Sequence, residues 1–186
     1  RMMKQFYIGL LLFASIMTGC NEKKSSSEKD RIQIYQIDSV DLHSGVQRMQ
    51  VSHINQDIVC KGKKYHLSIE RTPCDTLPVV KSEMGTFADN RISVSLVHEN
   101  GKSMFSKVFT KHTFASHITP SYLSRSVLEG VVFDDVKTAE NNEITLAASV
   151  SYPMTDMYIP FTIVISQEGR MSLSKDEDMG TLPPEE

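Results

Sequence analysis

Three stretches of the sequence alternate apolar and polar residues with a period of two, which is the pattern of a β-strand with one buried face. The apolar positions are Tyr65, Leu67 and Ile69, then Ile144, Leu146, Ala148 and Val150, and finally Ile159, Phe161, Ile163 and Ile165. Less regular strands are expected over residues 32–37, 49–60 and 131–133. The chain is therefore predicted to be mainly β (α+β), a single antiparallel β-sandwich or half-open barrel of about seven to nine strands.

Glycine-containing turns set the expected strand pairing. Asn100-Gly101 predicts a two-residue type I′ turn, because both residues tolerate positive φ. In SQEGRM, a three-residue loop with Gly169 in the left-handed conformation would place Met171 opposite Ile165. The facing pairs of the first hairpin are then Ile92 with Phe109, Val94 with Lys107 and Leu96 with Phe105.

One short helix is expected near residues 120–129. Its signals are Thr119 as a cap, Pro120 in the first turn, Leu123 and Val127 one turn apart, and Gly130 at the far end.

The N-terminal residues read as a secretion signal. Arg1 and Lys4 precede an apolar stretch that ends at Gly19, and this stretch is too short for an ordinary membrane-spanning helix. The small residues before Cys20 resemble the lipobox of bacterial lipoproteins, in which the cysteine receives lipid and becomes the mature N-terminus. The predicted organisation is a signal peptide over 1–19, a lipidated flexible tether over 20–31, one β-rich domain over 32–174 and an acidic flexible tail over 175–186.

The net negative charge of the chain argues against nucleic acid as a partner. The chain carries 20 basic and 23 acidic residues, and removal of 1–19 takes away Arg1 and Lys4 and leaves a net charge of −5. A protein that binds nucleic acid by charge has the opposite balance. The membrane, through the lipid on Cys20, is the one partner that the sequence indicates by class.

Cys60 and Cys74 remain after lipidation of Cys20. In an oxidising envelope such a pair invites a disulfide, which would stabilise the fold by about 3 kcal/mol. A turn over 61–63 would, however, pair Cys60 with Lys64 and leave Cys74 far along the hairpin. The sequence leaves two alternatives open for this pair, a disulfide or two small unbonded side chains.

The ionisable residues give no catalytic or metal signature. The histidines are scattered without helical i, i+4 pairs, so no metal, cofactor or catalytic residue is assigned. Lys107 is predicted to face Phe105 and Phe109, where it could bind an anionic ligand or protect an edge strand. An enzyme with an unrecognised site would have to bring together Lys107, His112, His117, Asp134 and Asp135.

The stretch SYPMTDMYIPFTIVISQEGRMSLSKDED, residues 151–178, together with the Cys20 segment and FSKVFTKHTF, resembles a group of small envelope lipoproteins of Bacteroides-type bacteria that form a domain-of-unknown-function family. The resemblance implies an envelope location and a β-rich body, and it implies no reaction. Pro153 and Pro160 bracket a loop that Tyr152 and Tyr158 flank. The candidate ligand-binding residues there are Tyr152, Thr155, Asp156 and Tyr158.

These features favour a lipid-anchored module of the cell envelope, placed at the outer membrane, that binds a protein, a glycan or a small ligand without catalysis. The alternatives are an envelope hydrolase with an unrecognised site and a purely structural envelope component. The sequence leaves open whether the body faces the periplasm or the cell surface.

Overall fold

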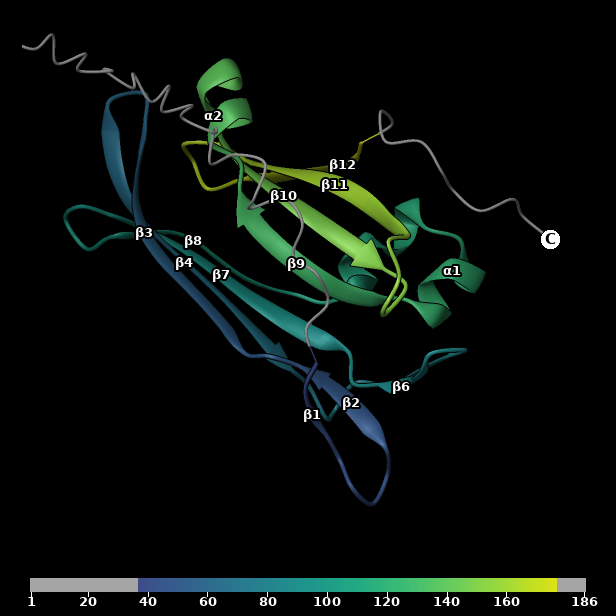
Figure 1. Ribbon diagram of the computed structural model, residues 1–186. Helices are drawn as coiled ribbons and strands as arrows, with labels where there is room; N and C mark the ends of the chain where they lie inside the picture. The colour runs from purple at the N-terminus through teal and green to yellow at the C-terminus, as the bar shows by residue number, and fades with distance from the viewer. Residues whose placement is uncertain (1–36, 177–186) are drawn as a thin grey trace, which may run out of the picture. The chain divides into compact units, whose positions relative to one another are not determined.

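β-Strands dominate the computed structural model, which describes residues 37–176 (Figure 1). The strands are β1 (Ile37–Val40), β2 (Val46–Met49), β3 (Ser52–Cys60), β4 (Lys63–Pro73), β5 (Val80–Ser82), β6 (Gly85–Phe87), β7 (Asn90–His98), β8 (Ser103–Phe109), β9 (Val127–Phe133), β10 (Ile144–Ser151), β11 (Tyr158–Ile165) and β12 (Met171–Lys175). A 3₁₀-helix, η1 (Lys111–His117), and two α-helices, α1 (Pro120–Arg125) and α2 (Asp135–Asn141), complete the described elements. The strands outnumber the prediction because β1, β2, β5 and β6 are too short to carry a periodic signal.

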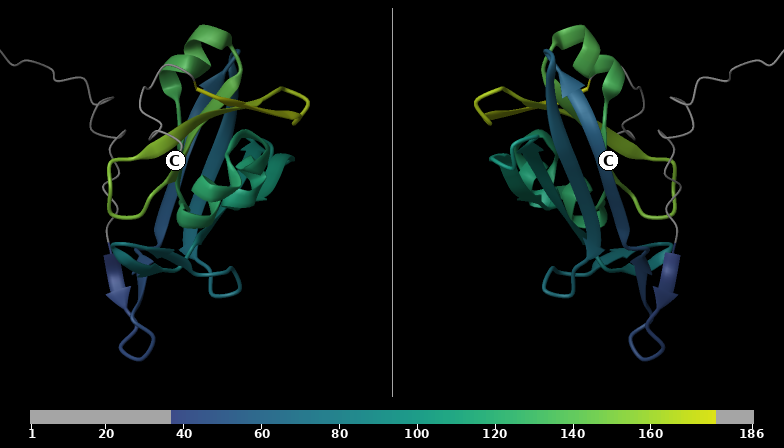
Figure 2. Two further views of the ribbon diagram at one scale, coloured as in Figure 1. Left: turned by 90° about the vertical axis from the view of Figure 1, so that its right-hand side faces the viewer. Right: turned by 90° about the vertical axis from the view of Figure 1, so that its left-hand side faces the viewer.

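The strands form three sheets of four. Sheet I has the order β3-β4-β7-β8, sheet II the order β12-β11-β10-β9, and sheet III the order β1-β2-β6-β5. All paired strands are antiparallel except β2 and β6, which run parallel. Sheets I and II pack against each other across one hydrophobic core, and Figure 2 views these layers from two sides. The mainly β prediction is confirmed as a sandwich, because the described strands close no barrel.

The alternating stretches of the sequence are β4, β10 and β11, and their apolar faces line the core. Burying a large apolar side chain contributes about 1.5–3 kcal/mol, so these faces dominate the stability of the sandwich. Helix η1 adds Phe114, whose ring centroid lies 4.7 Å from that of Phe161 and 6.3 Å from that of Phe109. Fully buried large residues of this core include Leu67, Ile92, Leu96, Phe109, Phe114, Leu128, Leu146, Phe161 and Ile163.

The β7–β8 hairpin has the predicted facing pairs but not the predicted turn. The N–H of Gly101 donates to the carbonyl of His98, and the N–H of His98 donates to the carbonyl of Lys102, each over 2.8 Å. The loop is therefore three residues long, with Gly101 at φ +83°, and the two-residue type I′ turn is wrong. A bulge at Met104 absorbs the additional residue and keeps the core face in register. The observed pairs are Ile92 with Phe109, Val94 with Lys107 and Leu96 with Phe105.

In the β3–β4 hairpin, by contrast, the observed turn is shorter than the predicted one. Cys60 pairs with Lys63 and not with Lys64, so the predicted three-residue turn is wrong. Lys61 and Gly62 take φ values of +49° and +72°. Two central residues with positive φ make a primed two-residue turn, whose twist matches that of the flanking strands. The β11–β12 hairpin is confirmed as predicted, with Ile165 opposite Met171 and Gly169 at φ +75°.

Helix α1 begins where the sequence indicates and ends four residues early. Thr119 caps it, and its Oγ1 accepts a hydrogen bond from the N–H of Tyr122 over 3.4 Å. The predicted extension to residue 129 is wrong, because Ser126 is extended and Val127 opens β9. Strand pairing with β10 buries Val127, and a β-branched residue packs better there than in a helix. Helix α2, capped by Asp134, was not predicted.

Strand β9 touches two separate cores. Val127 packs with Met49, Val80 and Phe87 in a smaller core under sheet III, whereas Leu128 packs in the main core. Adjacent residues of a strand point to opposite faces, so Val127 and Leu128 are buried on different sides of β9. The pairing of β9 with β10 shifts just after these two residues. Gly130 pairs with Ser149 and Leu128 with Val150, so Glu129 is the additional residue of a bulge. Strand β9 is therefore the joint between the sandwich and sheet III.

The predicted signal, the tether and most of the acidic tail lie outside the described residues. At the C-terminal end, Lys175 closes β12, and the carboxylate of Asp176 binds Thr162 Oγ1 over 2.6 Å and Lys137 Nζ over 2.9 Å. The body thus extends two residues beyond the predicted boundary at 174. Within residues 37–176, no helix has the length and apolar character needed to cross a bilayer.

The two three-residue loops provide a matched stability test. Gly101 and Gly169 have similar left-handed φ values, but a methyl group on Gly101 would point into open space, whereas one on Gly169 would overlap the backbone carbonyl of Met104. We expect Gly101→Ala to lower the free energy of unfolding by about 1–2 kcal/mol through φ strain alone. Gly169→Ala should lose roughly 1–3 kcal/mol more, because the β11–β12 turn must move away from β8.

Urea unfolding followed by circular dichroism measures both variants. Equal losses for the two glycines would show that the β11–β12 turn does not pack on the bulge of β8.

Candidate functional site

Lys107 lies on the predicted face of β8. It is half-buried, pairs with Val94 across β7, and places Nζ 5.8 Å from the centroid of the Phe109 ring. Because β8 is an edge strand of sheet I, the position also fits a lysine that protects an edge from pairing with another chain. The structure thus brings Lys107 to Phe105 and Phe109 as expected, and adds a cation–π contact at the rim of the core.

The loop between β10 and β11 separates its four candidate residues. Tyr152 stacks on Tyr122 of α1, with ring centroids 4.2 Å apart, and the Arg125 guanidinium lies 5.2 Å from the Tyr152 ring. Thr155 Oγ1 donates to the carbonyl of Tyr152 and accepts from the N–H of Met157, so it closes the loop. Asp156 and Tyr158 are exposed. Tyr152 and Thr155 therefore hold the loop, and Tyr158 and Asp156 remain available to a ligand.

Both remaining cysteines are free thiols. Cys60 is buried at the turn end of the β3–β4 hairpin, whereas Cys74 follows the last residue of β4. Eleven residues of extended strand cover about 35 Å, and a disulfide requires Cα atoms within roughly 7 Å. The unbonded alternative therefore holds in the structure. Cys74 Sγ lies 3.2 Å from Thr76 Oγ1, and this hydrogen bond lowers the pKa of the thiol.

The five residues of the hydrolase alternative do not converge. His112 and His117 are exposed on η1, next to α1, which precedes β9. Asp134 follows the last residue of β9, about 20 Å farther along the strand, and caps α2 by accepting from the N–H of Lys137. Helices α1 and α2 lie toward opposite ends of sheet II (Figures 1 and 2). Among the described residues, none of these five side chains is hydrogen-bonded or ion-paired to another of the five, and no three His, Cys, Asp or Glu side chains are grouped to hold a metal ion.

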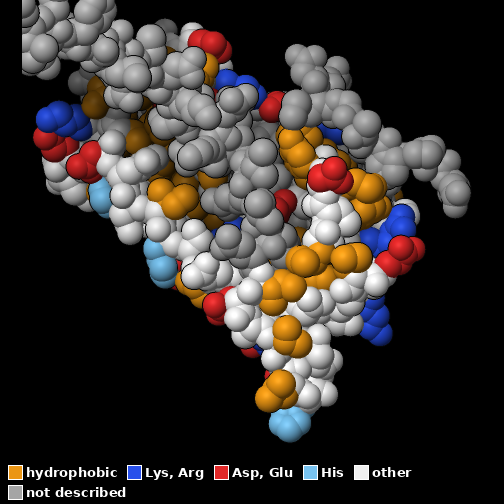
Figure 3. All heavy atoms as spheres, in the orientation of Figure 1, with side chains coloured by type: hydrophobic (Ala, Val, Ile, Leu, Met, Phe, Trp, Pro, Cys, Tyr) orange, Lys and Arg blue, Asp and Glu red, His pale blue; other side chains and the backbone are white. Residues whose placement is uncertain are grey.

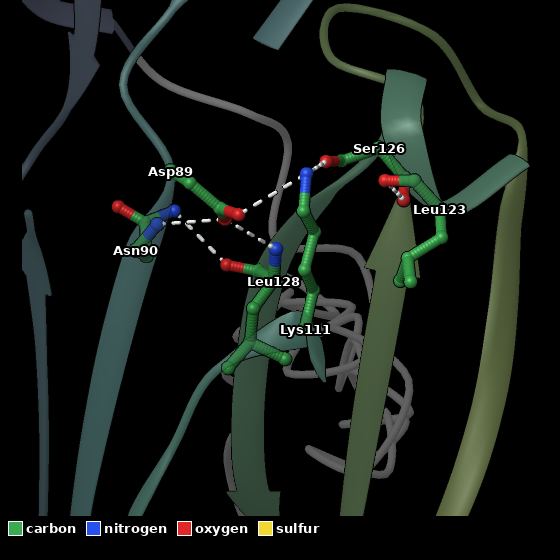
Figure 4. A network of polar contacts seen from close by, with 6 residues as sticks. All are labelled: Asp89, Asn90, Lys111, Leu123, Ser126 and Leu128. Carbon is green, nitrogen blue, oxygen red and sulfur yellow. Dashed lines mark hydrogen bonds and ion pairs between the residues drawn. The ribbon is translucent and has the colours of Figure 1, made fainter. Parts of the chain in front are cut away.

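A buried ion pair that the sequence did not reveal lies at the start of β9 (Figure 4). Lys111 Nζ is 3.3 Å from Asp89 Oδ2, and their side chains are only 6% and 1% exposed. The ammonium also donates to the carbonyl of Ser126 over 2.8 Å. Asp89 Oδ1 accepts from the N–H groups of Leu128 and Asn90 over 3.0 and 2.8 Å. Both charges are therefore paired and hydrogen-bonded, which is what their burial requires.

Two further side chains bind the same length of backbone. Asn90 Nδ2 donates to the carbonyl of Leu128 over 2.9 Å, and Arg71 Nη1 donates to the carbonyl of Glu129 over 2.8 Å. Arg71 Nη2 donates in addition to the carbonyl of Gln50 over 3.1 Å, next to sheet III. We call Arg71, Asp89, Asn90 and Lys111 the β9 clasp, because each of the four bonds to a backbone group of residues 126–129.

The β9 clasp supplies hydrogen bonds that a neighbouring strand would otherwise give to the start of β9. As the outer strand of sheet II, β9 has one row of N–H and carbonyl groups without a β-ladder partner, yet its first residues are buried. Buried backbone groups must be hydrogen-bonded, and the side chains of the clasp supply those bonds. Sequence patterns missed the clasp because Asp89 lies between two strands and Lys111 on a 3₁₀-helix, where no period marks the buried positions.

Glu129, the bulged residue of β9, has an unusual carboxyl group. Its Oε2 accepts a hydrogen bond from the buried Ser151 Oγ. Burial raises the pKa of this carboxyl, against the opposing effects of the Ser151 hydrogen bond and the Arg71 charge. Burial also raises the pKa of Tyr122, whose hydroxyl donates to the carbonyls of Val150 and Met157. Among the described carboxyl groups, Glu129 thus combines a raised pKa with a direct hydrogen bond to a serine hydroxyl.

Most of the sequence matches the model of one protein family. A family model described as a domain of unknown function, DUF4738, matches residues 30–173. The chain belongs to the DUF4738 family. The match covers both sheets of the sandwich, sheet III and all four residues of the β9 clasp. No curated protein matches the chain in sequence.

The clasp predicts a large and specific loss of stability. Lys111→Met keeps the side-chain length but leaves Asp89 as a buried carboxylate without its cation, so we expect the free energy of unfolding to fall by about 3–5 kcal/mol. The matched control is Lys64→Met, because Lys64 makes an exposed ion pair with Glu99 at 3.6 Å, and we expect a loss of about 0–1 kcal/mol there.

Denaturant unfolding at pH 7 compares the two variants. If both cost the same small amount, the Asp89–Lys111 pair does not hold the joint.

Glu129 gives a pH-dependent prediction. A carboxyl whose folded-state pKa is raised binds more protons folded than unfolded between its two pKa values, so its ionisation destabilises the fold as pH rises through that window. Glu129→Gln mimics the protonated form and retains an acceptor for Ser151. The variant should therefore be more stable than the wild type at pH 7 and equal to it at pH 4.

Thermal unfolding of both proteins at the two pH values measures the difference. A variant that is less stable than the wild type at pH 7 would contradict the raised pKa. The exposed Glu168, whose pKa is lowered by Ser166, is the control position, because Glu168→Gln should show no gain at pH 7.

Proposed function

We propose that the chain is a lipid-anchored protein of the bacterial cell envelope, held at the outer membrane through Cys20, whose β body is a non-catalytic binding or assembly module. The observation that carries the proposal is the order of segments along the chain. An apolar stretch ends at Cys20, a polar stretch follows it, and the family domain begins only at residue 30. A lipid on Cys20 would then carry the whole family domain at the membrane surface.

The arrangement of ionisable groups supports a binding role for the body. Its most deeply buried charges, those of Asp89 and Lys111, are occupied by each other and by the backbone of β9. Catalytic groups need access to a substrate and free hydrogen-bonding capacity toward it. The exposed loop residues Asp156 and Tyr158, by contrast, are carried on a rigid sandwich, which suits recognition of a protein, a glycan or a small ligand.

Lipidation gives a direct test with a matched control. We expect the wild-type chain, expressed in a bacterium, to enter the detergent phase on Triton X-114 partition, because two or more acyl chains anchor a protein stably. Cys20→Ser should reduce that partition roughly tenfold or more, whereas Cys74→Ser should leave it unchanged. Mass spectrometry of the N-terminal peptide should show a lipidated cysteine at position 20.

An unmodified Cys20 thiol in membranes of the native host would overturn the proposal. Detergent partition that persists in the Cys20→Ser variant would also do so, because the attachment would then not depend on a lipid at that cysteine.

A further inference from the structure

We propose that the tip of the β1–β2 hairpin docks into the bilayer to which Cys20 is anchored, so that the body lies on the membrane in one orientation. This inference rests on the proposed function, since it takes the lipid on Cys20 as given. Leu42 lies at the hairpin tip and is 96% exposed, the most exposed large apolar residue among the described positions. Val40, on the adjoining strand, is 49% exposed. These two residues define the apolar tip.

The apolar tip belongs to an apolar end of the molecule. Half of the ten exposed large apolar residues of the described chain lie in or beside sheet III, although this sheet holds only the short strands. They are Val40, Leu42, Val51, Val79 and Met84. Figure 3 shows hydrophobic side chains following the hairpin to its end, where it projects from the rest of the body. Exposed apolar side chains that gather at one end of a molecule point to an interaction site there.

The hairpin is built to present its tip rigidly. At its base, Ile37 pairs with the buried Met49 and packs on the core under sheet III. In the loop, Asp41 Oδ1 accepts from the N–H groups of His43 and Ser44 over 3.0 and 2.8 Å, and the carbonyl of Asp41 accepts from the N–H of Gly45 over 2.7 Å. Because the N–H groups of His43, Ser44 and Gly45 are already bonded, these groups lose little hydration if the tip enters the apolar edge of a bilayer.

Chain length favours the bilayer over a protein partner as the occupant. Ile37, the first described residue, opens β1 itself, so the 16 residues 21–36 separate Cys20 from the hairpin. A chain of this length reaches at most about 60 Å when fully extended, and a random coil of equal length would span roughly 20–25 Å. The five residue steps from Ile37 to Leu42 cover about 17 Å. The anchor therefore keeps the apolar tip within reach of the membrane at high effective concentration, which makes up for the small apolar area.

The charge of the tip indicates which lipid surface it suits. Residues 37–45 contain Asp38 and Asp41 and no lysine or arginine. Attraction to anionic headgroups is thus absent, and docking depends on apolar insertion. Zwitterionic phosphatidylcholine vesicles are the appropriate probe.

The test uses the full lipidated chain in such vesicles. The sequence contains no tryptophan, so Leu42→Trp introduces a single fluorescent reporter at the apolar tip. Val59→Trp is the matched control, because Val59 is an exposed apolar residue, 62% accessible, near the far end of β3 from sheet III. Lipids brominated in the upper acyl chain should quench about half or more of the Leu42→Trp emission and little of the Val59→Trp emission, since interfacial side chains lie roughly 5–10 Å deep.

The outcomes separate this inference from the proposed function. If both proteins float with the vesicles and are quenched equally, the anchor stands and tip docking is overturned. If neither protein floats, the lipid anchor is missing and both proposals fail. A blue shift of the Leu42→Trp emission that grows with protein concentration in the Cys20→Ser background, without vesicles, would assign the tip to a second copy of the chain and overturn bilayer docking.

Discussion

The buried pair of Asp89 and Lys111 is the interaction on which the arrangement of the sheets depends. Both charges meet at the start of β9, where one residue packs into the sandwich core and its neighbour packs under sheet III. The pair costs desolvation energy, which is offset because each charge also bonds to the backbone of β9 or of Asn90. A purely apolar joint would leave those backbone groups buried without partners. The ion pair therefore substitutes for the missing strand beside β9.

This joint explains how a small irregular sheet can be attached to a regular sandwich. The chain leaves sheet III after Phe87 and enters sheet I at Asn90, and the two residues between them include Asp89. The N–H of Ala88 bonds to the carbonyl of Gln47, while Asn90 Nδ2 bonds to Leu128 and lies 3.1 Å from Met49 Sδ. Sheet I, sheet II and sheet III thus converge within four consecutive residues. Disruption of the clasp would loosen the attachment of sheet III while the sandwich core stayed packed.

The sequence predicted those parts of the fold in which local pattern and tertiary burial agree. Strands β4, β10 and β11 alternate because one face of each meets the main core, and the same faces fixed the register of two hairpins. Turn lengths were wrong where a bulge at Met104 or positive φ at Lys61 changed the loop without changing the buried face. The predicted helix was too long because the spacing of Leu123 and Val127 also fits a helix. Only the pairing of Val127 with β10 shows that this residue belongs to a strand. Of the candidate site, Lys107 was placed correctly, whereas the clasp depends on contacts between residues up to 58 positions apart, which no local pattern encodes.

These contacts separate the residues that hold the sheets together from the residues that could meet a ligand or a membrane. The buried pair of Asp89 and Lys111 serves the joint, whereas the residues proposed to contact a ligand or a membrane sit on two separate projections, the loop between β10 and β11 and the β1–β2 hairpin. The loop carries Asp156 and Tyr158, a polar and an aromatic group, whereas the hairpin carries Leu42 and Val40 and turns its own aspartate back onto its backbone. An apolar tip suits a lipid surface, and a mixed polar and aromatic loop suits a soluble ligand. If the hairpin faces the membrane, then the rigid joint at β9 transmits that orientation to the sandwich and fixes the direction in which the loop is presented.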